Sequence, residues 1–204
     1  MRISGKRIGL ISGAVSALLL QSCAPPRPQA VEPENIVKPV EERRAEIQTI
    51  RSFEISGAIA AKNPKKSWTA TINWLQSGPA HYQLRLYGPL GSGAMLIKRQ
   101  GGQVSLQDGP KRVSSSNPDQ LLLKETGVRL PVRNLYYWVR ALPAPGAAKS
   151  ITRDRFNHIT RLSQDGYQVE YVKYTSTRKG DLPSSIRLKG HGISVKLIIK
   201  RWKV

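Results

Sequence analysis

From residue 53 to the C-terminus, apolar and polar residues alternate with a period of two along most of this chain. In residues 53–61, FEISGAIAA, and 67–74, SWTATINW, the apolar side chains fall on one face of an extended segment, as in a half-buried strand. A short basic turn with a proline separates these segments, so they predict a hairpin. Further strands are expected at 82–87, 94–99 and around 104–106. Strands at this hairpin spacing predict a meandering antiparallel sheet.

Two helical signals interrupt the strands. Asn117 can cap a helix that has Pro118 at its first position and Gly127 as its stop. A second short helix is expected within LPVRNLYYWVRALP, which ends in a proline. Beyond it the strand pattern returns at 159–163, 167–174, 182–189 and 193–202. Asp165-Gly166, between the first two of these strands, is a strong hairpin signal.

The chain is therefore expected to form one mainly β domain with helical insertions. A sheet of eight or more antiparallel strands is long enough to curl round and to close or nearly close. A curled sheet is either filled by its own side chains or hollow enough to hold a ligand. The inward residues here are Trp, Leu, Ile and Tyr, so such a hollow would be hydrophobic.

The N-terminus has the anatomy of an export signal. Basic residues are followed by an apolar stretch from Ile8 to Leu20, then by small residues and Cys23, the single cysteine. The segment resembles a bacterial lipobox, in which Leu20 and Ser22 fit the pattern and Gln21 is a less usual occupant. The resemblance implies that Cys23 is lipidated and becomes the first residue of the mature protein. An ordinary secretory signal that leaves an unpaired thiol is the alternative.

The residues after the cysteine divide the chain further. Residues 24–40 are rich in proline and read as an extended tether, and 41–50 could form a short helix. We therefore expect a lipoprotein signal peptide at 1–22, a lipidated N-terminus with tether and short helix at 23–50, and a folded domain at 51–204. By resemblance to the lipoprotein sorting rule, Ala24 in place of aspartate implies the outer membrane.

The chain is strongly basic, with 33 Lys and Arg against 13 Asp and Glu. Removal of the leader takes away only three basic residues, so most of the positive charge belongs to the folded domain. Such a body is attracted to anionic surfaces, whether nucleic acid, lipid head groups or an acidic protein. An exported chain rarely meets nucleic acid, so the last two are favoured.

The sequence predicts no enzyme, no metal site and no cofactor. His81, His158 and His191 lie on different expected strands or turns and lack metal-ligand spacing. The serines at 114–116 precede a helix and read as capping residues, without the glycine-flanked elbow of serine hydrolases. The glycines of residues 88–93 are followed by a strand, so they lack the helix N-terminus on which phosphate loops depend.

Several motifs, in order, resemble the LolB family of outer-membrane lipoproteins over about residues 50–204. They are YxLxLYGPLGSGAMLI, the segment LLLKETGVRLPVRNLYYWVRALPAPG, a QDGY hairpin, LPSSIRL and a final IIKRW. One departure is visible, because Tyr167 stands where the family often has tryptophan. The resemblance implies a half-open, incomplete antiparallel β-barrel capped by short helices around a hydrophobic cavity. It also implies a monomer that takes acylated lipoproteins from the periplasmic carrier LolA and inserts them into the lipid of the outer membrane, without covalent chemistry.

Two sets of site residues follow. The face that would cover acyl chains is expected to draw on Trp74, Leu84, Leu86, Met95, Ile97, Leu122, Leu123 and Trp138. For each of them, packing in an ordinary hydrophobic core is the alternative. The resemblance further implies that the Pro89-Leu90-Gly91 tip protrudes from the sheet and that its leucine acts on the membrane. A large aliphatic residue in a turn is otherwise unusual, since turn side chains generally face water. The alternative is a turn leucine that packs back on the core.

A second hypothesis keeps the chain in the envelope but changes its role. A structural or scaffolding lipoprotein could grip anionic envelope components through its basic face, with the sheet filled by its own side chains. Its binding to anionic liposomes would then weaken steeply with salt.

Overall fold

The computed structural model describes residues 32–33, 36–89, 93–127 and 131–204. Its helices are α1 (Val40–Gln48), α2 (Pro118–Thr126) and α3 (Val132–Trp138). The strands before α2 are β1 (Ser52–Lys62), β2 (Ser67–Ser77), β3 (His81–Tyr87), β4 (Ala94–Gln100), β5 (Gln103–Asp108) and β6 (Lys111–Ser115). Those after α3 are β7 (Ser150–Arg153), β8 (Ile159–Gln164), β9 (Tyr167–Thr177), β10 (Gly180–Gly190) and β11 (Ile193–Lys203). Within the described ranges, no helix is both long and apolar enough to cross a membrane.

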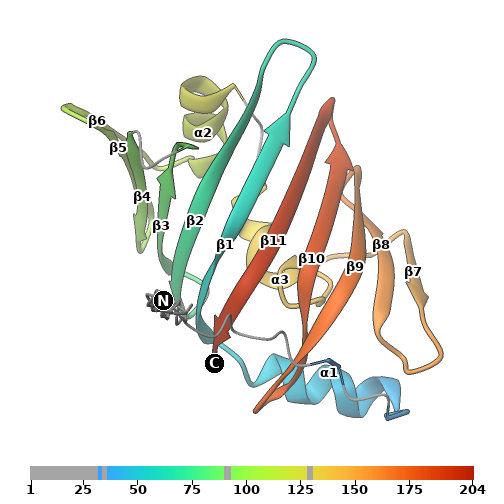
Figure 1. Ribbon diagram of the computed structural model, residues 1–204. Helices are drawn as coiled ribbons and strands as arrows, with labels where there is room; N and C mark the ends of the chain where they lie inside the picture. The colour runs from blue at the N-terminus through green and yellow to red at the C-terminus, as the bar shows by residue number, and fades with distance from the viewer. Residues whose placement is uncertain (1–31, 34–35, 90–92, 128–130) are drawn as a thin grey trace, which may run out of the picture.

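All the strands join one antiparallel sheet, as the alternating pattern predicts. Their order is β6-β5-β4-β3-β2-β1-β11-β10-β9-β8-β7, so the first and last long strands meet in the middle of the sheet. The strands β6 and β7 form its two edges and do not pair with each other, which leaves the curled sheet open (Figure 1). The fold is therefore mainly β, with an incomplete barrel and helical insertions.

The two edge strands are absent from the expected elements. Val113 is the one bulky apolar residue of β6, and Ile151 is the one of β7, so neither strand carries a readable alternation. Short polar strands are a common way to end a sheet, because they discourage pairing with other chains. Ser114 and Ser115 consequently lie in β6, and the Ser115 hydroxyl accepts a hydrogen bond of 3.0 Å from the backbone N–H of Asn117, the cap of α2.

The expected helix caps and turn are confirmed. The Asn117 side chain accepts a hydrogen bond of 3.0 Å from the Gln120 backbone N–H, and Gly127 ends α2 in the left-handed conformation. Asp165 and Gly166 both have positive φ, as a two-residue hairpin turn between β8 and β9 requires.

Gly57 marks a bulge at the centre of the sheet. The register between β1 and β11 shifts at Ser56/Gly57, and a Cβ at Gly57 would lie 1.9 Å from the Ile198 carbonyl oxygen. A bulge increases the local bend and twist of a strand. This one lies at the junction of the two halves of the sheet, where bending gives the sheet its concave face.

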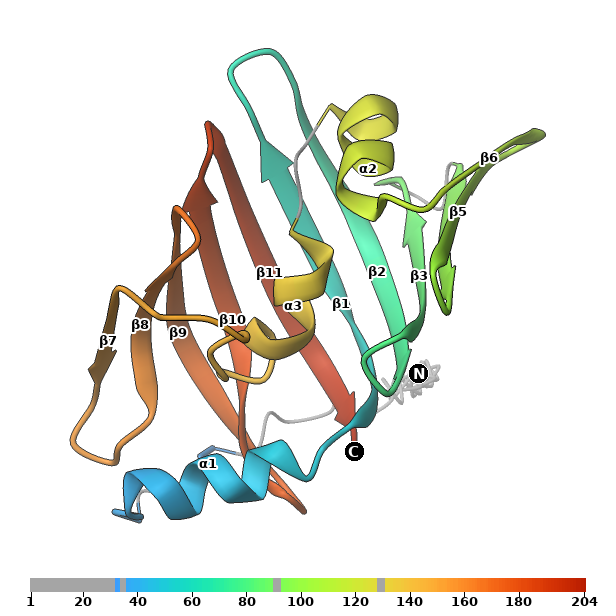
Figure 2. The ribbon, with the colours of Figure 1, turned by 180° about the vertical axis from the view of Figure 1, so that it is seen from behind.

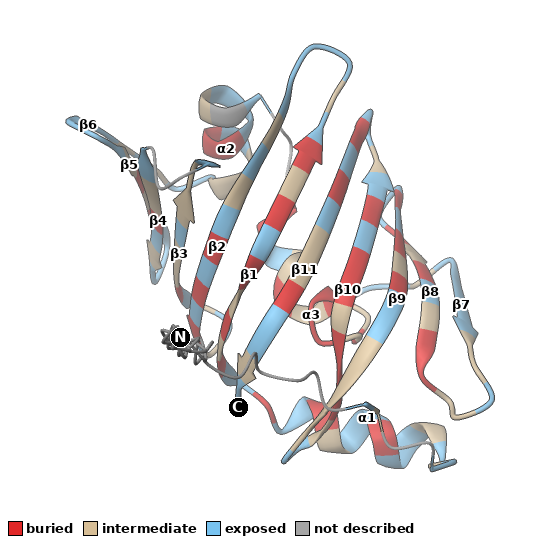
Figure 3. Cartoon of the chain, viewed as in Figure 1, coloured by how far each residue is buried: buried red, intermediate tan, exposed pale blue. Residues whose placement is uncertain are grey.

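The helices occupy two places. Helices α2 and α3 cover the concave face, where the buried residues of successive strands gather (Figures 2 and 3). Helix α1 lies across one end of the sheet (Figure 1). Because Ser52 pairs with Ser77 while Tyr87 pairs with Thr71, the turn after β3 lies toward the opposite end from α1.

A buried polar cluster holds α1 against its own end of the sheet. Arg43 donates to Asp181 at 3.1 Å and also to the backbone oxygens of Ile36 and Phe156. The ring nitrogens of His158 lie 3.0 Å from an Asp154 carboxylate oxygen and 2.8 Å from one of Asp181. Burial alone would raise the pKa of Asp181, but hydrogen bonds from His158, Ser176 and Arg43 outweigh it and lower the pKa to about 2.

Candidate functional site

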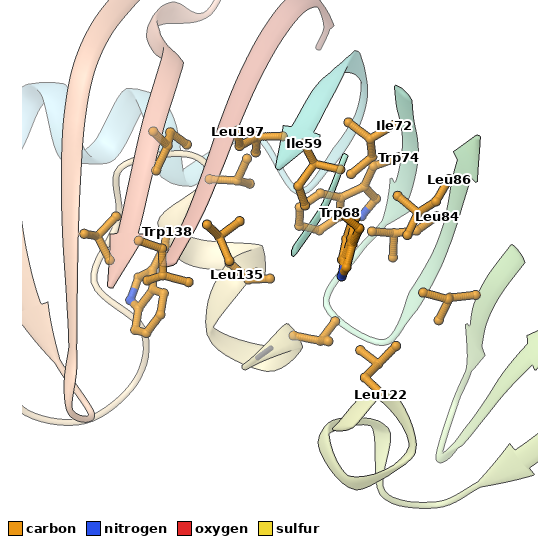
Figure 4. A pocket seen from close by; sticks show the side chains of 17 residues that line it. Ile59, Trp68, Ile72, Trp74, Leu84, Leu86, Leu122, Leu135, Trp138 and Leu197 are labelled. Atoms are coloured by element: carbon orange, nitrogen blue, oxygen red, sulfur yellow. The ribbon is translucent and has the colours of Figure 1, made fainter. Parts of the chain in front are cut away.

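An apolar cavity lies between the concave face of the sheet and helices α2 and α3 (Figure 4). Every side chain that lines it is aliphatic or tryptophan. The lining residues are Ile59, Trp68, Ile72, Trp74, Leu84, Leu86, Ile97, Leu122, Val132, Leu135, Trp138, Val139, Val169, Ile186, Leu188, Val195 and Leu197. Such a lining can bury hydrocarbon but offers no group for acid–base or nucleophilic chemistry.

The period of the strands determines this lining. In β2, Trp68, Ile72 and Trp74 fall on one face, and the register places Trp74 opposite both Ile55 of β1 and Leu84 of β3. In β11, Val195 and Leu197 share the concave face because they pair with Leu188 and Ile186 of β10.

Two of the cavity tryptophans have their polar atom turned to protein partners. The Trp74 indole N–H donates to the Gln76 side-chain oxygen at 2.7 Å, and the Trp138 indole N–H donates to that of Gln164 at 2.9 Å. The Gln164 amide also bonds both backbone groups of Ala144, which fixes its orientation. These buried pairs present the rings to the cavity as purely apolar surfaces.

The free space is small. The cavity measures about 70 Å³, whereas pockets that hold drug-sized ligands measure roughly 300–1,000 Å³. A ligand of the size of an acyl chain therefore does not fit into the free space of this closed arrangement.

The helical cover is fastened unevenly. The end of α3 is tied to the centre of the molecule, because Tyr171 donates to the Trp138 backbone oxygen at 2.9 Å and Arg140 donates to that of Ile50. Helix α2 contacts β5 and the edge strand β6. Its C-terminal glycine accepts a 2.6 Å hydrogen bond from the Asn63 side chain, in the β1–β2 turn. Helix α2 is thus held at the β5–β6 side of the sheet and at the β1–β2 turn, whereas α3 is held near the centre.

Six of the eight residues expected to cover acyl chains line this cavity: Trp74, Leu84, Leu86, Ile97, Leu122 and Trp138. Met95 packs beside the core at the same face, and Leu123 is 38% exposed on the outer side of α2. The other lining residues include Trp68, Leu135 and the apolar residues of β10 and β11. Period-two alternation was the available signal for these strand residues, but alternation also describes a filled core.

The residues of the expected membrane-insertion tip are described in part. Pro89 is exposed and, with Gly88, borders a groove on the outer face of the sheet beside Ala58, Thr69 and Thr71. Leu90 and Gly91 of the tip, and the lipidation candidate Cys23, lie outside the described residues.

Titratable residues do not converge on the cavity. His158 belongs to the cluster beneath α1, and His81 begins β3. His191 lies in the β10–β11 turn and contacts the backbone oxygen of Asp165. In the described ranges, no group of three or more His, Cys, Asp or Glu residues is arranged to hold a metal ion.

Comparisons with known proteins agree with this geometry. The family model for outer membrane lipoprotein LolB matches residues 51–202. The LolB of Stutzerimonas stutzeri is 38% identical over 189 residues, which cover 92% of this chain and 91% of that protein. The LolB of Pseudomonas aeruginosa is 34% identical over 199 residues, or 97% of each chain.

A solved structure supports the fold independently. The crystal structure of a LolA superfamily protein from Nitrosomonas europaea aligns with a TM-score of 0.52 at 13% identity. The alignment covers 82% of this chain and 94% of the other. At that identity the likeness concerns the fold alone, which is the open sheet with its helical cover. The match to the family model over the whole folded domain and the identity to its members assign the chain: it belongs to the LolB family of outer-membrane lipoproteins.

Proposed function

We propose that this outer-membrane lipoprotein receives acylated lipoproteins from the soluble carrier LolA in its apolar cavity and releases their acyl chains into the outer membrane. The observation that carries the proposal is the lining, which holds aliphatic and tryptophan side chains from both halves of the sheet and from two helices. No bond is made or broken in this transfer.

The physical need for such a cavity is large. A triacylated lipoprotein has some forty methylenes, and at about 0.8 kcal/mol each their exposure to water would cost on the order of 30 kcal/mol. Free diffusion through an aqueous compartment is therefore excluded. Without an external energy source, the receptor must offer the chains an environment at least as favourable as that of the carrier.

The small volume of the cavity makes transfer a two-state process. In the closed state the apolar residues pack against one another, and in the loaded state acyl chains replace those contacts. Contacts between aliphatic side chains and acyl chains resemble the contacts that they replace, so opening exchanges apolar surface for apolar surface.

The N-terminal tether is long enough for the end of the sheet that carries Pro89 to face the membrane. Residues 24–39 can reach roughly 50 Å when extended, and an 11-residue strand such as β1 spans roughly 36 Å. A protein anchored at Cys23 can therefore present the end of the sheet that carries Pro89 to the bilayer, although α1 lies at the other end.

The scaffolding hypothesis explains the positive charge and leaves the cavity without a role. Some of the basic side chains on the outer face are already paired, as Arg187 is with Glu170 and Lys203 is with Glu54. The family and the lining both favour transfer.

Depletion of the protein in cells is expected to leave acylated lipoproteins bound to their periplasmic carrier. Separation of periplasm from membranes, followed by immunoblotting of the carrier complex, would measure that accumulation. A scaffolding protein would instead change envelope integrity while lipoproteins still reached the outer membrane, and that result would contradict the proposal.

A further inference from the structure

Trp68 differs from the other three tryptophans in the state of its indole N–H. Trp74, Trp138 and Trp202 donate theirs to Gln76, Gln164 and the Pro183 backbone oxygen, at distances of 2.7, 2.9 and 2.9 Å. The Trp68 nitrogen is buried and has no hydrogen-bond partner among the described residues. Buried indole N–H groups are ordinarily paired, because leaving one unpaired forfeits its hydration without compensation.

The position of this donor is informative. Trp68 lies on the concave face of β2 and lines the apolar cavity, and Figure 4 shows its ring reaching from the sheet toward the helices. The other buried side-chain atoms without a partner in the described ranges belong to Arg43, Glu46 and Tyr82, none of which lines the cavity. Since Trp74 and Trp138 are engaged, Trp68 holds the free donor of the described lining.

A lone donor in an apolar cavity selects a particular kind of ligand group. It can be satisfied only by an acceptor, and a hydrocarbon chain has none. Each acyl chain of a lipoprotein ends in a carbonyl group, in an ester to the glyceryl group on the cysteine sulfur or in an amide on the cysteine nitrogen, and each carbonyl oxygen is an acceptor. A cation or a hydroxyl-rich head group would bring further donors into a lining that has no acceptor side chain to receive them.

We propose that the Trp68 indole N–H donates a hydrogen bond to an acyl carbonyl oxygen of the bound lipoprotein. This inference rests on the proposed function and adds to it a specificity-determining contact. The contact determines how far the acyl chain enters the cavity. It places the carbonyl end of one chain beside Trp68, and the methylenes beyond the carbonyl then lie against the apolar lining. The carbonyl belongs either to a glycerol ester or to the amide on the cysteine nitrogen.

Three synthetic lipopeptides with equal chain lengths separate these sources. Each carries three chains and no free amine: one has two ester-linked chains and an N-thioacyl chain, one has two ether-linked chains and an N-acyl amide, and one has two ether-linked chains and an N-thioacyl chain, whose sulfur is a weak acceptor. Binding is measured by titration of the mature chain, residues 23–204, with Cys23→Ala to remove its own lipid. We expect wild-type Trp68 to bind one carbonyl-bearing peptide about tenfold more tightly than the last, as a hydrogen bond of about 1.4 kcal/mol implies.

Trp68→Phe is expected to bind all three peptides with equal affinity, because it keeps an aromatic ring and loses the donor. The comparison is made within one variant, so any change in cavity size affects each peptide alike. Trp202→Phe is the matched control and should keep the preference, since its N–H is bound to the Pro183 backbone oxygen and its ring is outside the cavity lining. An isosteric benzothiophene side chain at position 68 should behave as phenylalanine does.

Isotope-edited infrared spectroscopy gives a second readout. The preferred carbonyl is labelled with carbon-13, and its stretching band is compared between the free and the bound lipopeptide. Binding to wild type should move the band to lower wavenumber, and binding to Trp68→Phe should not. A preference that survives in Trp68→Phe, or equal binding of all three peptides by wild type, would overturn the inference and leave the proposed function standing. Failure of wild type to bind any of them would overturn both.

Discussion

Replacement of Leu90 by glutamate is expected to block insertion of lipoproteins into membranes while leaving their uptake unchanged. One leucine buried in an acyl layer contributes roughly 1.5–3 kcal/mol, which is too little to anchor a protein but enough to orient a tethered one. A carboxylate at the same place must be dehydrated to enter the bilayer, so the free energy of transferring the side chain into lipid becomes unfavourable. The substitution changes a turn residue and none of the described residues that line the cavity, so acyl binding should persist.

Liposome flotation with radiolabelled lipoprotein measures this step. Leu90→Glu should retain the label on the protein, and wild type should deliver it to the floating liposomes. Leu75→Glu is the control, because Leu75 is a surface leucine, 52% exposed on β2, and lies outside the turn. Normal delivery by Leu90→Glu, or an equal loss in Leu75→Glu, would show that the turn has no special role.

Cross-linking of the cavity cover is expected to abolish loading. The Asn63 side chain donates to the Gly127 backbone oxygen at 2.6 Å, and a Cβ built on Gly127 would lie 3.7 Å from the Asn63 side-chain nitrogen. Cysteines are placed at both positions in a chain with Cys23→Ala, and loss of both free thiols on oxidation shows that the disulfide has formed. The bond would hold the end of α2 to the β1–β2 turn and keep the cavity near its present volume.

The oxidised protein should bind the ester-linked lipopeptide at least about tenfold more weakly, since its loading-competent state is no longer populated. The same sample after reduction is the control, and it should recover binding. The positive φ of Gly127 makes a cysteine there less stable, so both measurements belong below the unfolding temperature of the variant. Unimpaired loading of the oxidised form would mean that the cavity opens elsewhere.

Much of the fold is predictable because its signals are local. Alternation over 53–61 and 67–74 determines both the strand pair and the face that is buried. The Asn117 cap, the Gly127 stop and the Asp165-Gly166 turn act through their own backbone geometry, so three or four residues are enough to identify them. Edge strands β6 and β7 have too few apolar residues to give such a signal.

The site is less predictable, because pairing at a distance determines it. Trp74 and Gln76 lie two apart on one strand face, so their contact follows from the strand period. Trp138 and Gln164 come from α3 and β8, and Arg43 and Asp181 lie 138 residues apart, so neither contact could be read from the sequence. The free N–H of Trp68 becomes visible only after the partners of the other tryptophans are known. Leu122 faces the cavity and Leu123 faces outward, which depends on how α2 is rotated.

The central claim is that this chain accepts an acylated lipoprotein from a soluble carrier. The direct measurement is to mix residues 23–204 bearing Cys23→Ala with purified LolA that holds a radiolabelled lipoprotein, and to separate the two proteins. We expect the label to move to this chain without ATP, because its apolar lining offers the acyl chains an environment at least as favourable as the carrier's. Label that stays on the carrier, with both proteins folded, would contradict the account.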